Sequence, residues 1–166
     1  MKISYSVLLA FIFLMPCVVM ARLGETREQC IERYGNVYNE SKVDGNGVKL
    51  SLGDRNADPK VTPIVTVILF DNICHQINFL SRKLNYFKLD DVKAILEKNS
   101  DGHTWSEPKF ENEDYSWSRS DGGKAVFTTF FEVDIESGAF EKLSKQGKDQ
   151  QQKSLESQKQ DKLKNF

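Results

Sequence analysis

Histidine and cysteine are scarce in this chain, whose 166 residues include two histidines and three cysteines. Metal centres and acid–base active sites take many of their side chains from these residue types. Neither His75 and His103 nor Cys30 and Cys74 show the paired spacing of a zinc site. We therefore expect no metal and no cofactor.

Sequence motifs of the common nucleotide-binding and hydrolytic sites are also missing. The chain has no G-x-x-x-x-G-K-[ST] loop, no G-x-G-x-x-G turn and no G-x-S-x-G elbow. An excess of positive charge is missing as well, because the formal net charge is −1. Nucleic-acid binding depends on a concentrated positive field that displaces counterions from phosphates. We expect no nucleic-acid partner.

Long apolar runs are limited to Val7 through Val19, which is too short to span a hydrocarbon core comfortably. Lys2 precedes this run, Pro16 interrupts it, and small residues at 19 and 21 fit a signal-peptidase site. These features predict a signal peptide over residues 1–21, cleaved after Ala21. The mature chain would be exported, periplasmic or extracellular, with no stable membrane anchor.

The cysteines agree with export. Cys17 would leave with the signal peptide, so Cys30 and Cys74 remain as an even pair in an oxidising compartment. We expect one disulfide between them, and two buried free thiols are the alternative.

Residues 22–140 are expected to form one domain, followed by a polar tail. Thr26 and Gln29 make a capping box that predicts a helix start, and Gly35 is placed to end that helix. From 141 to 166 the chain is rich in Lys and Gln with few bulky apolar residues, which favours a solvated tail or a fraying helix.

Ile64 to Phe70 is the strongest strand signal, because nearly every residue is β-branched or bulky and apolar. Asp71-Asn72 offers a two-residue turn, and Ile73 to Leu80 returns as the second strand. Strict alternation puts Val65, Val67, Leu69 and Cys74 on one face. The other face then holds Ile64, Ile68, Phe70, Ile73, His75, Ile77 and Phe79.

The later segments repeat this order of elements. Leu89 to Lys98 has the periodicity of an amphipathic helix, and strands are expected at 115–119 and over 124–135, the latter as one strand or two. Glu132, Asp134 and Glu136 alternate with apolar residues, which predicts one wet face. The fold class is therefore α+β, with short helices packed on an antiparallel sheet in two related helix-plus-hairpin halves.

The opening segment Arg22-Leu23-Gly24-Glu25-Thr26, followed by Cys30 and then Arg33-Tyr34-Gly35, resembles a group of small exported proteins of unknown function. Trp105, Trp117 and the Asp121-Gly122 turn extend this resemblance. The Thr-capped helix before strands is more distantly similar to SmpA/OmlA-type assembly lipoproteins and to β-lactamase-inhibitor proteins. The resemblance implies a two-layer fold whose open face or helix edge binds another protein.

Aromatic residues are concentrated at Trp105, Tyr115 and Trp117, which would form an interaction surface if they were exposed together. We expect a noncatalytic binding module with a protein partner. The alternative is a small secreted hydrolase with a site formed by His103 and the acidic loop 107–114, which contains Glu107, Glu111, Glu113 and Asp114. That alternative requires a pocket in which these groups converge.

Overall fold

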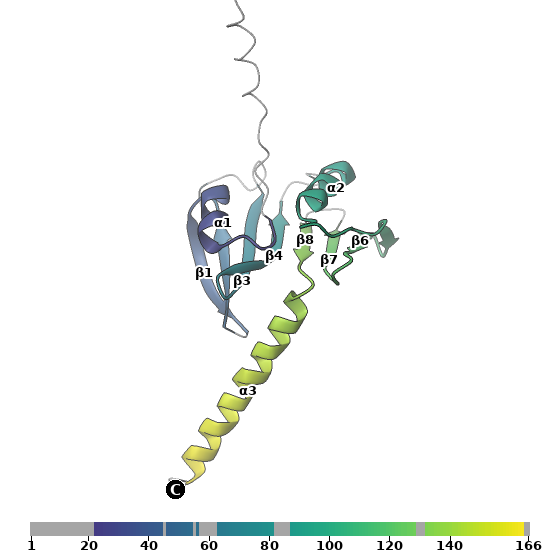
Figure 1. Cartoon of the computed structure of the whole chain (residues 1–166). Helices are drawn as coiled ribbons and strands as arrows, with labels where there is room; N and C mark the ends of the chain where they lie inside the picture. The colour runs from purple at the N-terminus through teal and green to yellow at the C-terminus, as the bar shows by residue number, and fades with distance from the viewer. Residues whose placement is uncertain are drawn as a thin grey trace, which may run out of the picture.

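The structure is a computed structural model that describes residues 22–44, 46–54, 56, 63–81, 87–128 and 132–164. The described part is a mixed α+β fold with three helices and eight strands (Figure 1). The helices are α1 (Arg27–Tyr34), α2 (Leu89–Lys98) and α3 (Phe140–Lys164). The strands are β1 (Val37–Val43), β2 (Gly47–Leu52), β3 (Ile64–Phe70), β4 (Ile73–Leu80), β5 (Lys109–Glu111), β6 (Asp114–Ser118), β7 (Lys124–Thr128) and β8 (Glu132–Glu136). The predicted signal peptide lies outside the described residues.

All strands belong to one antiparallel sheet with the order β1-β2-β3-β4-β8-β7-β6-β5. Strands β1 to β4 form one meander and β5 to β8 form another, because sequential strands pair within each set. The two meanders join where β4 pairs with β8, with Ile77 opposite Ile135 and Phe79 opposite Val133. We call the pairing of β4 with β8 the seam of the sheet.

The predicted start and end of the first helix are confirmed. Thr26 is the N-cap of α1 and forms a capping box with Gln29, and Gly35 ends the helix with a φ of 92°. The predicted strand at 64–70 and helix at 89–98 have the same bounds in the structure. The segment 124–135 forms two strands, β7 and β8, and β1 is an additional edge strand that the sequence did not indicate.

A bulge changes the predicted faces of the β3–β4 hairpin. Asp71 and Asn72 form the expected turn, with φ of 49° and 66°, and Leu69 faces Cys74 as predicted. The next pair is Ile68 with Gln76, so His75 is an extra residue. Ile77 and Phe79 consequently lie on the face of Val65, Val67 and Leu69, and their predicted placement on the opposite face is wrong.

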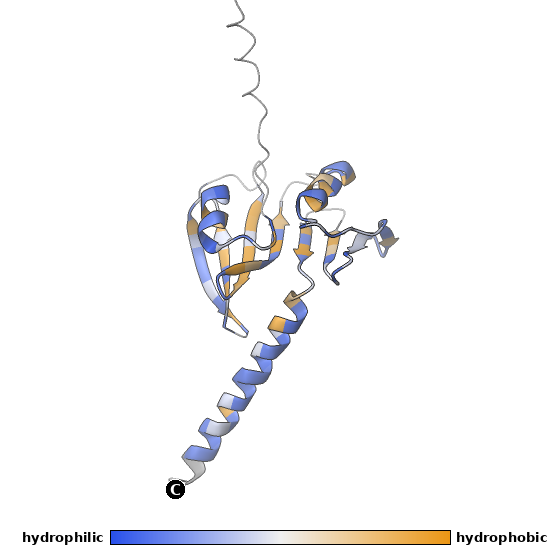
Figure 2. Cartoon of the chain, viewed as in Figure 1, coloured by the Kyte–Doolittle hydropathy of each residue, from blue (hydrophilic) through white to orange (hydrophobic). Residues whose placement is uncertain are grey.

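One hydrophobic cluster combines buried residues from strands β2 to β4 and β6 to β8 with Cys30 of α1 and Val92, Ile95 and Leu96 of α2. We call the sheet face that enters this cluster the core face. Side chains that alternate with it lie on the open face. Those of β2 and β8 are half-buried or exposed: Lys49, Ser51, Glu132, Asp134 and Glu136. The apolar strands and the hydrophilic α3 are visible in Figure 2.

Helix α3 extends from the end of β8 past the β1–β2 hairpin (Figure 1). Phe140 at its start packs against Phe70, with ring centroids 6.0 Å apart, and Lys148 lies 3.7 Å from Asp44 in the hairpin. The described side chains from Lys148 to Asp161 are exposed. Among the described helices, none combines the length and hydropathy needed to cross a membrane.

Candidate functional site

Cys30 of α1 and Cys74 of β4 lie 4.3 Å apart, and both are free and fully buried. The fold thus brings the predicted pair together without a bond between the two residues. The neighbouring Cys30 thiol, followed by burial, raises the pKa of the Cys74 thiol well above its ordinary value. The same contact lowers the pKa of the Cys30 thiol, so the two thiols shift in opposite directions. Both thiols are fully buried, which keeps them from reagents in solution.

The segment Leu23 to Thr26 forms a strap along the start of β4. The Gly24 amide donates to the Cys74 carbonyl and the Cys74 amide donates to the Glu25 carbonyl, each at 2.8 Å. Glu25 is buried, and its carboxylate accepts two hydrogen bonds from Arg33 at 2.5 and 3.1 Å. Gly24, Glu25 and Arg33 therefore hold α1 and β4 together.

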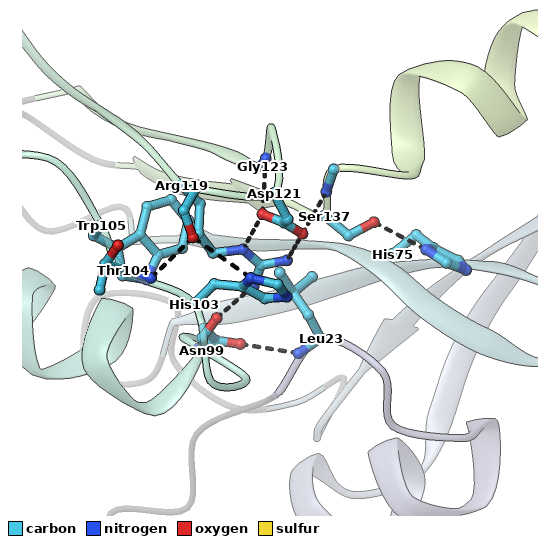
Figure 3. Close-up of polar contacts among 12 residues, drawn as sticks. Leu23, His75, Asn99, His103, Thr104, Trp105, Arg119, Asp121, Gly123 and Ser137 are labelled. Carbon is cyan, nitrogen blue, oxygen red and sulfur yellow. Dashed lines mark hydrogen bonds and ion pairs between the residues drawn. The ribbon is translucent and has the colours of Figure 1, made fainter.

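A buried guanidinium in the β6–β7 turn connects this turn to two other parts of the chain (Figure 3). Arg119 is 5% exposed, donates twice to the Asp121 carboxylate at 2.7 Å and donates to the Asn99 carbonyl at 2.7 Å. Asn99 in turn accepts from the Leu23 amide at 2.9 Å. The hydrogen bonds from Arg119 hold the pKa of Asp121 well below its ordinary value. This network ties the strap to α2 and to the β6–β7 turn, and each charge in it is paired.

The three predicted aromatic residues are not exposed together. Trp117 is 4% exposed, and Trp105 is half-buried with its Nε1 donating to the Leu96 carbonyl at 2.8 Å. Tyr115 is half-buried and stacks on Phe127, with ring centroids 6.2 Å apart. Phe110, beside Tyr115, is 59% exposed. Most of the aromatic concentration therefore belongs to the core face, and Phe110 is its exposed end.

The groups of the predicted hydrolytic site lie at the surface. His103 is exposed and its Nδ1 is 3.5 Å from the Ser120 hydroxyl, and Glu107, Glu111 and Glu113 are exposed. In the part of the chain that the structure describes, no three His, Cys, Asp or Glu side chains are grouped to hold a metal. A hollow of about 540 Å³ lies elsewhere, between α3 and the β1–β2 hairpin.

His75 lies on the bulge, half-buried, with its Nδ1 2.9 Å from the Ser137 hydroxyl. Burial lowers the pKa of its imidazole. The ring also lies against Phe70, with centroids 6.1 Å apart. The contacts with the Ser137 hydroxyl and the Phe70 ring hold the His75 imidazole in place at this end of the sheet.

A ladder of amides and carboxylates follows the seam on the open face. Gln76 of β4 donates through Nε2 to both oxygens of Asp134, at 3.0 and 2.9 Å, and to Glu136 at 3.3 Å. Asn78 of β4 donates through Nδ2 to Glu132. Three carboxylates thus stand in a row along β8, held by neutral amides. We call these five residues the seam ladder.

The charge of the seam ladder is incompletely compensated. Burial, then the charge of Asp134, raises the pKa of Glu136, against a lowering effect of Lys124. Burial is also the main cause of the raised pKa of Asp134. Lys124 is paired with Glu136 in the strand register, yet its ammonium lies 3.3 Å from Glu141 of α3. A cationic group brought to the seam would therefore gain Coulomb energy that offsets the cost of burying these carboxylates.

The sequence indicated part of this site. Alternation in β8 predicted a wet face containing Glu132, Asp134 and Glu136, and the structure confirms this alternation. The amides Gln76 and Asn78 were missed, because their place opposite the carboxylates depends on the bulge at His75 and on pairing between strands over 50 residues apart in sequence.

No protein family, curated protein or solved structure matches the chain.

Proposed function

We propose that this chain is a noncatalytic binding module whose open sheet face binds a Lys- or Arg-rich segment of another protein. The observation that supports the proposal is the seam ladder, in which three half-buried carboxylates are held by two neutral amides. Over the open face the acidic side chains exceed the basic ones: Glu111, Asp114, Glu132, Asp134 and Glu136 stand against Lys49, Lys109 and Lys124. Opposite charge on a partner would steer its approach and fix its register.

Binding of an oligolysine peptide, measured by titration calorimetry at low salt, tests this proposal. The test variant replaces all three seam carboxylates: Glu132→Gln, Asp134→Asn and Glu136→Gln. The matched control makes the same change of charge on exposed positions of α3: Asp149→Asn, Glu156→Gln and Asp161→Asn. We expect the seam variant to bind about tenfold more weakly or worse, and the α3 variant to bind like the native protein. Equal binding by both variants would refute the assignment.

We further propose that the module is exported after removal of residues 1–21 and that Cys30 and Cys74 are joined in the exported form. Their separation of 4.3 Å supports the pairing. Because both thiols are fully buried in the folded chain, an oxidant would reach them during folding. Intact-mass analysis of the native protein checks both points: the chain should begin at Arg22 and should weigh two hydrogens less than the reduced form.

The two meanders are proposed to be related halves. In support, each unit begins with one helix and continues with four strands, α1 with β1 to β4 and α2 with β5 to β8, and the last strand of each unit forms the seam. This arrangement is compatible with the proposed kinship to the β-lactamase-inhibitor and SmpA/OmlA types and to the exported group that opens with Arg-Leu-Gly-Glu-Thr. A binding site at the seam would then use side chains from both halves.

A further inference from the structure

Strand β5, at one end of the sheet, is an edge strand whose sequence is complementary to itself. Strand β5 has the sequence Lys109-Phe110-Glu111, and it is the last strand in the sheet order. All three residues are exposed, and Phe110 is the most exposed large hydrophobic residue among those described, at 59%. An exposed apolar side chain on an unpaired edge is a feature that soluble proteins usually avoid.

The hairpin geometry decides which backbone groups of β5 point outward. Asn112 and Glu113 form a two-residue turn with φ of 52° and 70°, as in a type I′ hairpin, and Glu111 faces Asp114 beside it. In such a hairpin the pair flanking the turn exchanges hydrogen bonds, and the next pair, Phe110 with Tyr115, does not. The amide and carbonyl of Phe110 therefore point away from β6, toward the free edge.

We propose that β5 pairs with β5 of a second copy of this chain, antiparallel and centred on Phe110. A two-fold axis at Phe110 lets the Phe110 residues of the two copies exchange both backbone hydrogen bonds, as in a hydrogen-bonded pair of an antiparallel ladder. Lys109 of each copy then stands opposite Glu111 of the other, on the same face. Two opposite-charge pairs and one aromatic pair form from three residues of each chain.

The same register limits how far the pairing extends. Pro108 and the turn at Asn112 bound β5, and beyond them Glu107 of one copy would approach Glu113 of the other, where like charges repel. The contact is small compared with the 1,200 Å² or so that stable complexes bury. The dimer is therefore weak and depends on protein concentration. This interface lies at the sheet edge and is separate from the seam ladder, so it goes beyond the proposed function.

Sedimentation velocity of the purified protein over a wide concentration range tests the inference. The native protein should shift from monomer toward dimer as concentration rises. Lys109→Glu places Glu opposite Glu twice, and Glu111→Lys places Lys opposite Lys twice, so each variant should dimerise about tenfold more weakly or less. Because both side chains are exposed, the variants should fold like the native protein, which circular dichroism checks.

Two further samples separate this register from a general charge effect. The double variant Lys109→Glu/Glu111→Lys restores both opposite-charge pairs and should dimerise like the native protein. An equimolar mixture of the two single variants should form a heterodimer, since each Glu would then face a Lys. A native protein that stays monomeric at all concentrations, or a dimer that both single variants retain, would overturn the proposal.

Discussion

Reduction of the proposed Cys30–Cys74 bond is expected to remove a large share of the stability of this protein. The bond would close a loop of 44 positions, from 30 to 74. The chain-entropy model gives about 4 kcal/mol for a loop of this length. Small domains are stable by roughly 5–15 kcal/mol in total.

The native structure sets how much of this value is realised. The two residues lie 4.3 Å apart in a fully buried contact between α1 and β4, whereas the sulfurs of a disulfide are about 2.05 Å apart. The local backbone is held by two hydrogen bonds between the strap and Cys74, so closing the gap costs some strain. We therefore expect reduction to lower the free energy of unfolding by about 2–4 kcal/mol.

Urea unfolding of the oxidised protein, compared with protein reduced in the unfolded state and then refolded, measures this difference. The double variant Cys30→Ala/Cys74→Ala is the matched control, because it should unfold identically with and without reductant. If the oxidised and reduced forms of the native sequence have the same unfolding midpoint, the argument from loop entropy fails. If mass analysis finds two thiols in the oxidised sample, the pairing itself is wrong.

Three other predictions concern stability. Arg119→Met should lower the free energy of unfolding by about 3 kcal/mol in urea melts, the low end for a broken buried ion pair, because Asp121 retains some solvent contact. Gly138→Ala should lower the free energy of unfolding by about 2 kcal/mol, because an added Cβ would overlap the Asp121 carbonyl. Gly102→Ala should lower it by about 1 kcal/mol, because Gly102 has open space around it but a φ of 77°. Asp134→Asn should gain stability relative to the native protein as the pH is raised above 3.8, because the raised pKa of Asp134 means that its charged form is disfavoured by folding; a difference independent of pH would contradict this.

The local elements could be predicted because their signals are local. Thr26 and Gln29 fix the start of α1 within four residues, and the Asp71-Asn72 turn fixes the first pairs of the β3–β4 hairpin. The β-branched and bulky apolar residues from Ile64 to Phe70 predict a central strand, because such side chains fit a pleated and largely buried surface. Each of these elements depends on residues that are neighbours in sequence.

The faces and the site could not be predicted in the same way. A single extra residue, His75, reverses which side of β4 enters the core, and no local feature of the sequence indicates where a bulge will form. The buried Arg119 donates to the Asn99 carbonyl of another segment, and the Asn99 side chain accepts from Leu23, 76 residues earlier in the chain. Such polar networks depend on contacts between distant residues, which alternation and capping rules do not describe.

The location of the seam ladder suggests a trade-off between stability and binding. On the core face the seam consists of Ile77, Phe79, Val133 and Ile135, whose burial stabilises the junction of the two meanders. On the open face the same strands carry carboxylates whose raised pKa values show that folding disfavours their charge. Uncharged side chains at Asp134 and Glu136 would avoid this cost. The proposed cationic partner would compensate this charge, so replacing Asp134 and Glu136 by amides should increase stability while it weakens the proposed binding.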